Sequence, residues 1–230
     1  MRPPTVALFD IDGTLVKSDG VGRRSINRAF EAEFGRADAC DGFRFDGLTD
    51  CLIARRGLSA IGQPATEENI ARLLSAYLLA LESEVTRAST AQYSLHAGME
   101  TAILRAKQAG IAVGLGTGNI LDGARLKLEK VGVYHHFEFG GFGSDAEDRV
   151  ELVRCGAERG AARLDVPLRD CRVVVIGDTP HDVRAAQGIG AECIGVGTGS
   201  YSAAELLAHG ASRAFADFAD PAAIDALLGA

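Results

Sequence analysis

The sequence predicts an α/β protein in which a parallel sheet carries helices on both faces and an all-helical segment is inserted after the first strand. A short apolar run at residues 6–9 indicates a buried strand near the start of the chain. Residues 17–95 then show helical spacing of apolar side chains, and from residue 98 helical and strand-like segments alternate. Such alternation implies parallel strands joined by right-handed crossovers. We therefore expect a core domain of residues 1–16 and 96–230, and an inserted helical domain of residues 17–95.

Within the insert, the spacing predicts helices and no strand, after a connecting loop at residues 16–20. The first helix is expected from about residue 21 and should stop at Gly35. Thr49 or Asp50 can cap a second helix, since both side chains accept hydrogen bonds from free backbone N–H groups. A third helix should begin near Thr66 and carry an apolar stripe to Leu81.

In the core, alternating elements predict a Rossmann-like sheet. The expected helices are residues 99–109, 121–131, 148–161, 183–187, 203–209 and 221–228, and the expected later strands are residues 111–115, 137–140, 172–176, 193–196 and 214–215. In open α/β sheets, ligands bind at the carboxyl ends of the strands. Asp10, Thr117 and Asp178 each follow such a strand end, so we expect one cleft to collect them.

Composition narrows the classes of function. The chain has 230 residues, 47% of them hydrophobic, and a net charge of −7. An acidic protein argues against nucleic acid as a partner, although a metal ion could still attract a phosphorylated substrate. We see no targeting segment and no apolar run long enough for a membrane helix, so we expect a cytoplasmic protein with no membrane partner. Five scattered cysteines without a C-x-x-C pattern predict reduced thiols, buried as small apolar side chains.

Two acidic residues follow the first strand. Asp10 and Asp12 are two positions apart and precede a turn at Gly13. Side chains alternate along an extended segment, so the two carboxylates should share a face and repel each other. Mg²⁺, which prefers oxygen ligands, would relieve this repulsion. Taken alone, the pair could equally be ordinary turn formers.

Residues 9–15, Phe-Asp-Ile-Asp-Gly-Thr-Leu, resemble the signature of the haloacid dehalogenase superfamily of phosphohydrolases. Two later segments resemble further motifs of that family, in the same order. Thr117 ends a strand in Gly-Thr-Gly-Asn and matches the residue that holds the phosphoryl group, with Gly118 and Asn119 as further donors. Residues 177–182, Gly-Asp-Thr-Pro-His-Asp, are similar to the final family motif and contain Asp178 and Asp182.

The third motif of the family departs from its usual form. The family places a lysine before the last motif strand, whereas residues 141–167 contain none. Arg149 stands at the equivalent place and could bind phosphate in a bidentate manner, though arginine and lysine are not interchangeable. Lys127 and Lys130, on the preceding helix, are alternatives that we interpret as exposed charges.

The resemblance implies phosphoryl transfer in two steps. Asp10 would attack phosphorus and Asp12 would act as general acid and then as general base. Mg²⁺ would be held by Asp10, the backbone carbonyl of Asp12, and Asp178. Asp182 could be a further ligand, could hold another group in place, or could be an ordinary acid at a helix start.

The helical insert resembles the C1-type cap of the phosphoglycolate-phosphatase-like subfamily. Arg23, Thr49 and Asp50 are the insert residues that we expect to influence specificity, although a solvated arginine and a plain helix cap are equally good readings. The expected partner is a small phosphorylated metabolite, and the expected assembly is a monomer or homodimer. Two alternatives stay open: a phosphomutase of the β-phosphoglucomutase type, and a non-catalytic phosphate-binding or partner-binding relic of the fold.

Overall fold

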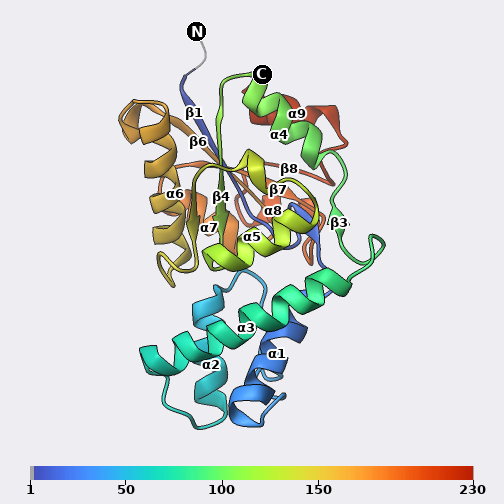
Figure 1. The fold of residues 1–230 in the computed structure, drawn as a ribbon. Coiled ribbons are helices and arrows are strands. Elements are labelled where there is room, and N and C mark those ends of the chain that lie inside the picture. Colours follow the sequence, from blue (N-terminus) through green and yellow to red (C-terminus); the bar gives the residue numbers. More distant parts are fainter. Residues whose placement is uncertain (1–2, 230) are drawn as a thin grey trace.

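The computed structural model describes residues 3–229, and its central feature is a parallel sheet (Figure 1). Over the described residues this sheet has six strands in the order β5-β4-β1-β6-β7-β8. The strands are β1 (Thr5–Phe9), β4 (Ala112–Thr117), β5 (Gly140–Phe142), β6 (Arg172–Gly177), β7 (Glu192–Val196) and β8 (Arg213–Phe215). All neighbouring pairs are parallel. The predicted α/β class and its sheet are therefore confirmed.

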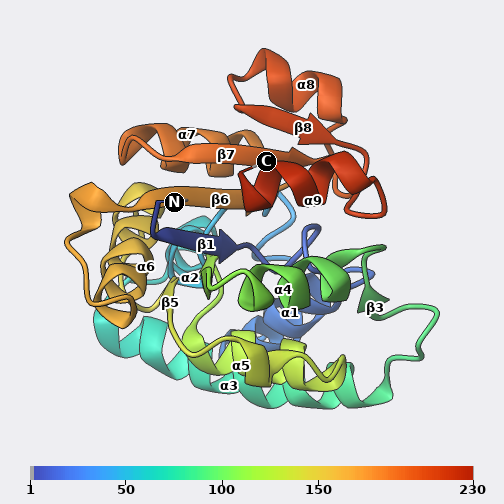
Figure 2. The same cartoon turned by 90° about the horizontal axis from the view of Figure 1, so that it is seen from above.

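Helices cover both faces of the sheet (Figure 2). One face is covered by α6 (Arg149–Arg163), α7 (Pro180–Gly188) and α8 (Ala203–Ala208), and the other by α4 (Met99–Gln108), α5 (Leu121–Lys130) and α9 (Pro221–Leu228). Short 3₁₀ turns are η1 (Tyr134–His136) and η2 (Leu168–Asp170).

Strand β1 is buried along its whole length and packs on both layers. Val6 and Leu8 belong to the apolar cluster under α6 and α7, whereas Ala7 and Phe9 belong to the cluster on the opposite face. Alternating side chains of a central parallel strand must be apolar on both faces, which explains the continuous apolar run in the sequence.

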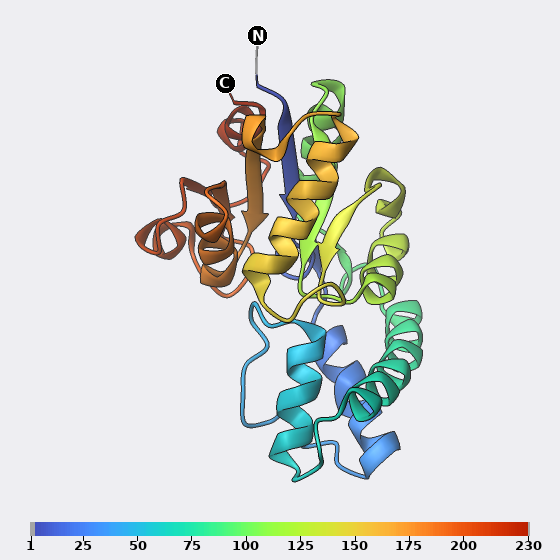
Figure 3. The ribbon, with the colours of Figure 1, turned by 90° about the vertical axis from the view of Figure 1, so that its left-hand side faces the viewer.

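The insert consists of α1 (Val21–Phe34), α2 (Asp50–Ala60) and α3 (Glu67–Arg87), which lie together beyond one end of the sheet (Figures 1 and 3). Helix α1 ends at Gly35 in the left-handed conformation, as its sequence predicts. The Thr49 hydroxyl accepts a hydrogen bond from the Leu52 N–H and caps α2, and Thr66 caps α3 in the same way. These three elements were all predicted.

Two short strands connect the insert to the sheet. β2 (Val16–Lys17) and β3 (Ser94–Leu95) pair in antiparallel orientation, so the chain enters and leaves the insert side by side. The predictions of a loop at residues 16–20 and of an insert without strands are wrong at these positions. Strands of two residues show no periodicity that a sequence could reveal.

The strand predicted at residues 137–140 is also displaced, because β5 begins at Gly140. Phe137 is buried against Phe9, with ring centroids 6.2 Å apart, rather than in a strand. A Cβ atom at Gly141 would collide with the Leu152 carbonyl of α6. Glycine therefore forms the strand here because only glycine allows the helix to approach so closely.

The cysteines differ from the prediction of five buried thiols. All five cysteines are free, but only Cys40 and Cys193 are buried, and the other three are partly exposed. Among the described helices, none is both long and apolar enough to cross a membrane.

Candidate active site

The candidate active site lies where the carboxyl ends of β1, β4 and β6 face the insert. β1 pairs with both other strands, and Phe9 is opposite Leu115 and Ile176. These registers bring Asp10, Thr117 and Asp178 to one edge of the sheet. A cavity of about 450 Å³ opens there, and its lining includes Asp10, Asp12, Asn119, Lys127, Arg149 and Asp178.

Arg149 links two of the predicted acids. Its Nη2 atom lies 2.7 Å from Asp10 Oδ2 and 2.5 Å from Asp182 Oδ1, and Nε lies 3.0 Å from the same Asp182 oxygen. All three side chains are buried. Burial raises the pKa of Asp10 to about 6, although the charge of Arg149 acts in the opposite direction. Arg149 thus lies beside the predicted nucleophile, Asp10.

Asp182 has both carboxylate oxygens engaged by protein groups. Oδ1 accepts from Arg149, while Oδ2 accepts from the backbone N–H and the hydroxyl of Thr179, at 3.0 and 2.7 Å. The Asp182 N–H donates in return to the Thr179 hydroxyl, so the two residues form a capping box at the start of α7. These contacts support the reading in which Asp182 caps a helix and orients Arg149.

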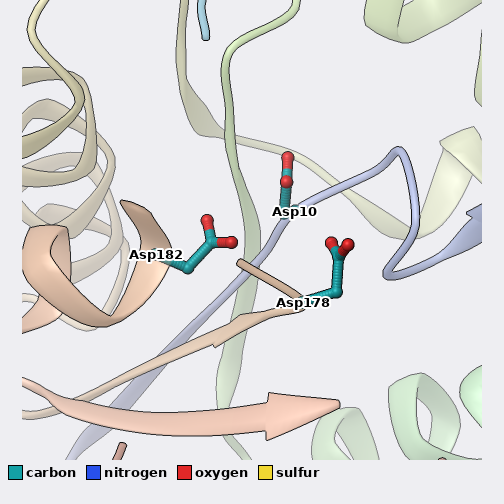
Figure 4. A group of neighbouring side chains, drawn as sticks. All are labelled: Asp10, Asp178 and Asp182. Atoms are coloured by element: carbon teal, nitrogen blue, oxygen red, sulfur yellow. The ribbon is translucent and has the colours of Figure 1, made fainter. Parts of the chain in front are cut away.

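Asp178 lies close to Asp10 (Figure 4). Its Oδ1 accepts a hydrogen bond of 2.8 Å from the Thr14 hydroxyl. Gly13 and Gly199 line its carboxylate so closely that a Cβ atom at either position would collide with Oδ2. Burial, followed by repulsion from Asp182 and Asp10, raises the pKa of Asp178 well above its usual range.

The residues fit a divalent cation. One oxygen from each of Asp10, Asp178 and Asp182 lies within 4.8 Å of the others. Arg149 is the basic side chain that forms ion pairs with this group, through Asp10 and Asp182, so three carboxylates and one guanidinium leave an excess of negative charge for a cation to offset. Carboxylate oxygens are the donors that Mg²⁺ prefers. Because the oxygens of Asp182 are already engaged, Asp10 and Asp178 are the better candidates for ligands.

Asp12 lies opposite a lysine that the sequence interpretation placed on the surface. Lys127 Nζ lies 2.6 Å from Asp12 Oδ2, and its side chain is only 3% exposed. The prediction that Lys127 is an exposed charge is therefore wrong, whereas Lys130 is exposed as predicted. Burial alone would raise the pKa of Asp12. The charge of Lys127, with hydrogen bonds from Lys127, Asn119 and Ser18, outweighs burial and lowers that pKa.

The signal for Lys127 was present in the helical spacing. Ile120, Ala124, Lys127 and Leu128 lie at positions i, i+4, i+7 and i+8, which is one face of a helix, and all four are buried. A lysine on an apolar stripe indicates a buried, partnered charge, because an unpaired lysine is almost never fully buried.

Asn119 joins this lysine to the end of β4. Its side-chain amide donates to Asp12 Oδ2 and to Thr117 Oγ1, both at 2.9 Å, and its carbonyl oxygen accepts from Lys127 Nζ at 2.6 Å. The backbone N–H of Asn119 also donates to Thr117 Oγ1. With two donors on its oxygen, the buried Thr117 hydroxyl has its own hydrogen left to donate.

The insert contacts the site through the segment before α2. The Asp50 N–H donates to the Gly118 carbonyl at 2.8 Å, and Asp50 Oδ2 accepts from the Ile120 N–H at 2.9 Å. A Cβ atom at Gly118 would collide with the Leu48 carbonyl oxygen. Thr49 is buried as a helix cap. Asp50 therefore fastens the insert to residues 117–119, the phosphate-loop candidate, whereas the Thr49 hydroxyl caps α2 within the insert.

Arg23 lines the same cavity from α1. Its guanidinium donates to the Cys40 and Phe43 carbonyls, at 3.1 and 3.0 Å, and stacks on the Phe45 ring at 3.7 Å. No carboxylate of the described residues pairs with it in an ion pair. The Arg23 guanidinium is thus a positive charge fixed in position on the insert side of the cavity.

A Rossmann-like sheet with buried acids and basic partners at its carboxyl edge defines an α/β enzyme with an oxygen-rich polar site. The sequence model of the haloacid dehalogenase-like hydrolases matches residues 4–190. The chain belongs to this family, and it is a hydrolase. The predicted family and the prediction of an enzyme are confirmed.

Individual relatives cover the chain almost completely. Protein CbbY from Cereibacter sphaeroides is 27% identical over 238 residues, covering 93% of this chain and 92% of that protein. The structure of CbbY from Rhodobacter sphaeroides in complex with phosphate has a TM-score of 0.73 at 23% identity, covering 96% and 99% of the two chains. A predicted phosphoglycolate phosphatase from Haemophilus somnus has a TM-score of 0.70 at 17% identity, covering 97% and 99%. These structural likenesses support the shared fold.

Proposed function

We propose that this hydrolase is a Mg²⁺-dependent phosphatase that cleaves a small phosphomonoester through an aspartyl-phosphate intermediate. The observation that carries the proposal is the position of Asp10, whose carboxylate lies 2.7 Å from Arg149 and within 4.8 Å of an Asp178 oxygen. A nucleophilic carboxylate beside a cation-binding acid and a guanidinium suits attack on a charged phosphoryl group.

In the first step, an Asp10 oxygen forms a bond to phosphorus while the bond from phosphorus to the substrate oxygen breaks. The leaving oxygen takes a proton from Asp12 and departs as an alcohol. Arg149 and the Thr117 hydroxyl, with the N–H groups near Gly118, stabilise the phosphoryl oxygens. A bound Mg²⁺, held by Asp10, the Asp12 carbonyl and Asp178, would neutralise charge on these oxygens.

In the second step, water attacks phosphorus, Asp12 accepts a proton from that water, and the Asp10–phosphorus bond breaks. The lowered pKa of Asp12 makes the carboxylate its resting form, which is the form that accepts a proton. For the first step Asp12 must first take up a proton. The intermediate is hydrolysed to phosphate, and Asp10 returns to its starting state.

The insert is proposed to act as a cap of residues 17–95 over this site. It supplies one wall of the cavity through Arg23, Phe45, Leu48 and Tyr77. A cap that closes over the site keeps bulk water from the intermediate. It also contacts the leaving group, so its side chains determine substrate specificity.

The substrate class follows from the size and charge of the cavity. A space of about 450 Å³ suits a small metabolite. Arg23, without an acidic partner among the described residues, is placed for a second anionic group such as a carboxylate or a second phosphate. A CbbY mutant has been solved in complex with xylulose-(1,5)bisphosphate, a phosphorylated compound with two anionic ends. We therefore propose a phosphoglycolate-like or bisphosphate substrate.

The test is release of inorganic phosphate from a panel of small phosphorylated acids, sugars and nucleotides, with Mg²⁺ and with a chelator. We expect turnover that the chelator abolishes, and none by the Asp10→Asn variant. Circular dichroism of that variant shows whether its fold is intact. No turnover of any substrate, including p-nitrophenyl phosphate, would favour the non-catalytic alternative. Isomerised sugar phosphate without released phosphate would favour the mutase.

A further inference from the structure

We propose that Lys127 is a positioning residue for the reaction, one that holds the Asp12 carboxylate and the Asn119 amide in their working orientation. The inference rests on the phosphatase function proposed above. It adds a second basic residue to the proposed site, because Lys127 lies ten positions after Thr117 at the end of β4 and does not contact Asp10.

Lys127 is buried together with two hydrogen-bond partners for its ammonium group. Its ammonium group makes two short bonds of 2.6 Å, one to Asp12 Oδ2 and one to Asn119 Oδ1. Removing an ammonium group from water costs several kcal/mol, so a lysine stays buried only where such bonds compensate. The bonds are charge-assisted and therefore geometrically demanding.

The insert covers this ammonium group. Gly22 of α1 lies so near that a Cβ atom built on it would be 3.5 Å from Lys127 Nζ and 4.0 Å from the Tyr77 hydroxyl. The Tyr93 hydroxyl donates to the Lys127 carbonyl at 3.2 Å. The insert thus shields the lysine side of the ion pair from water, whereas the Asp12 side chain is 38% exposed. Shielding one partner strengthens the attraction that restrains the carboxylate, compared with a pair that is fully exposed.

Lys127 fixes which way the Asn119 amide faces. An ammonium group only donates, so it must meet the Asn119 carbonyl oxygen, and the amide NH₂ is then turned towards Asp12 and Thr117. In that orientation the amide NH₂ donates one hydrogen bond to Asp12 and one to Thr117, each 2.9 Å long. One buried cation thereby sets the position of the proton-transfer residue and the hydrogen-bonding state of the phosphoryl-binding hydroxyl.

The same bonds distinguish the two oxygens of Asp12. Lys127 and Asn119 both bond to Oδ2. No hydrogen bond from either residue reaches Oδ1, and we assign proton exchange with the leaving group and with water to that oxygen. Loss of Lys127 frees the carboxylate to rotate, so we expect a specific loss of proton transfer.

The experiment compares wild type, Lys127→Met and Lys130→Met on a series of aryl phosphates, from p-nitrophenyl to phenyl phosphate, in Mg²⁺. Lys130 is an exposed lysine on the same helix and is the matched control. The measured quantity is the dependence of log kcat/KM on the pKa of the leaving phenol. A good leaving group departs without a proton, whereas a poor one needs the acid.

For Lys127→Met we expect kcat/KM to fall roughly 100-fold with phenyl phosphate and no more than about 5-fold with p-nitrophenyl phosphate. The dependence on leaving-group pKa becomes steeper than in wild type, and Lys130→Met matches wild type. The slope does not depend on the concentration of active enzyme, so partial unfolding cannot produce this result.

An unchanged slope in Lys127→Met, whatever its overall activity, overturns the inference. Should that variant not fold, Lys127→Gln is measured in the same way, and a wild-type slope there overturns the inference as well. Wild type that hydrolyses none of the series instead contradicts the phosphatase proposal, so the two failures are distinguished.

Discussion

The Arg149 guanidinium lies 2.7 Å from the Asp10 carboxylate, so the proposed nucleophile has an arginine as its basic neighbour. The resemblance to the haloacid dehalogenase family leads one to expect a lysine there. Arginine keeps its charge at any working pH and offers several donors in one plane. Here it uses them on Asp10, on Asp182 and, at 3.3 Å, on the Gly47 carbonyl of the insert.

Replacing Arg149 tests its role directly. We expect Arg149→Ala to lower kcat by roughly 100-fold or more, because a charged donor to the phosphoryl oxygens is lost. Arg149→Lys should recover only part of this loss, since an ammonium group cannot contact Asp10 and Asp182 in the same way. Steady-state kinetics on the best substrate of the panel measures both. A kcat of Arg149→Ala equal to that of wild type would contradict a catalytic role for Arg149.

Asp182 should matter for stability as well as activity. Asp182→Ala removes a partner from a buried guanidinium and also the capping box of α7, so we expect a loss of about 3 kcal/mol in the free energy of unfolding. Glu205→Ala removes the acid of an exposed capping box at α8, with no buried charge left behind, and should cost clearly less. Urea unfolding measures both losses, and equal losses would contradict a special role for the Arg149 contact.

The contact between Gly118 and the insert should not tolerate a side chain. Gly118→Ala places a methyl group against the Leu48 carbonyl, so the insert must move away from the phosphate-loop candidate. We expect kcat/KM to fall at least about 10-fold, because small displacements of positioning groups are costly in rate. Gly42→Ala, at an exposed glycine with open space around it, is the control and should leave kcat/KM unchanged.

Asp50 gives a prediction about pH. Burial raises the pKa of Asp50 to about 6 from 3.8, although the charge of Lys127 lowers it. Between pH 3.8 and pH 6, Asp50 is largely ionised in the unfolded chain but still protonated in the folded protein. This group therefore lowers the free energy of unfolding progressively as pH rises, and most fully above pH 6. We expect Asp50→Asn to be more stable than wild type at pH 7 by roughly 2–3 kcal/mol, and the difference to vanish towards pH 4.

The measurement for Asp50 is urea unfolding of wild type and Asp50→Asn across this range. Asn keeps an acceptor for the Ile120 N–H, so the helix contact survives the change. A stability difference that stays constant from pH 4 to pH 7 would contradict the raised pKa.

The fold could be predicted where one local pattern dominated. The β-branched run of β6 and the cap residues Thr49 and Thr66 each determine local structure through their own side chains, and all appear where expected. The displaced β5 strand could not be predicted, because it depends on glycines that let a helix from later in the chain approach. Such a long-range steric requirement leaves no local periodicity.

The candidate site also has a part that the sequence predicts and a part that it does not. Asp10, Thr117 and Asp178 follow strand ends, and parallel pairing alone brings strand ends together. The burial of Lys127 depends on helices of the insert that cover it, and the engagement of both Asp182 oxygens depends on Arg149 from another helix. Neither fact can be deduced from strand order, although the spacing of Lys127 on its apolar face was a usable signal.

The antiparallel pairing of β2 with β3 has a consequence for engineering. Because Val16 faces Leu95 across this ribbon, the two ends of the intervening polypeptide are already neighbours. A foreign segment with closely spaced termini could be grafted between them without changing the register of any strand in the large sheet. The proposed cap could thus be exchanged as a unit, provided that the new segment again covers Lys127 and contacts the Gly118 carbonyl as Asp50 does.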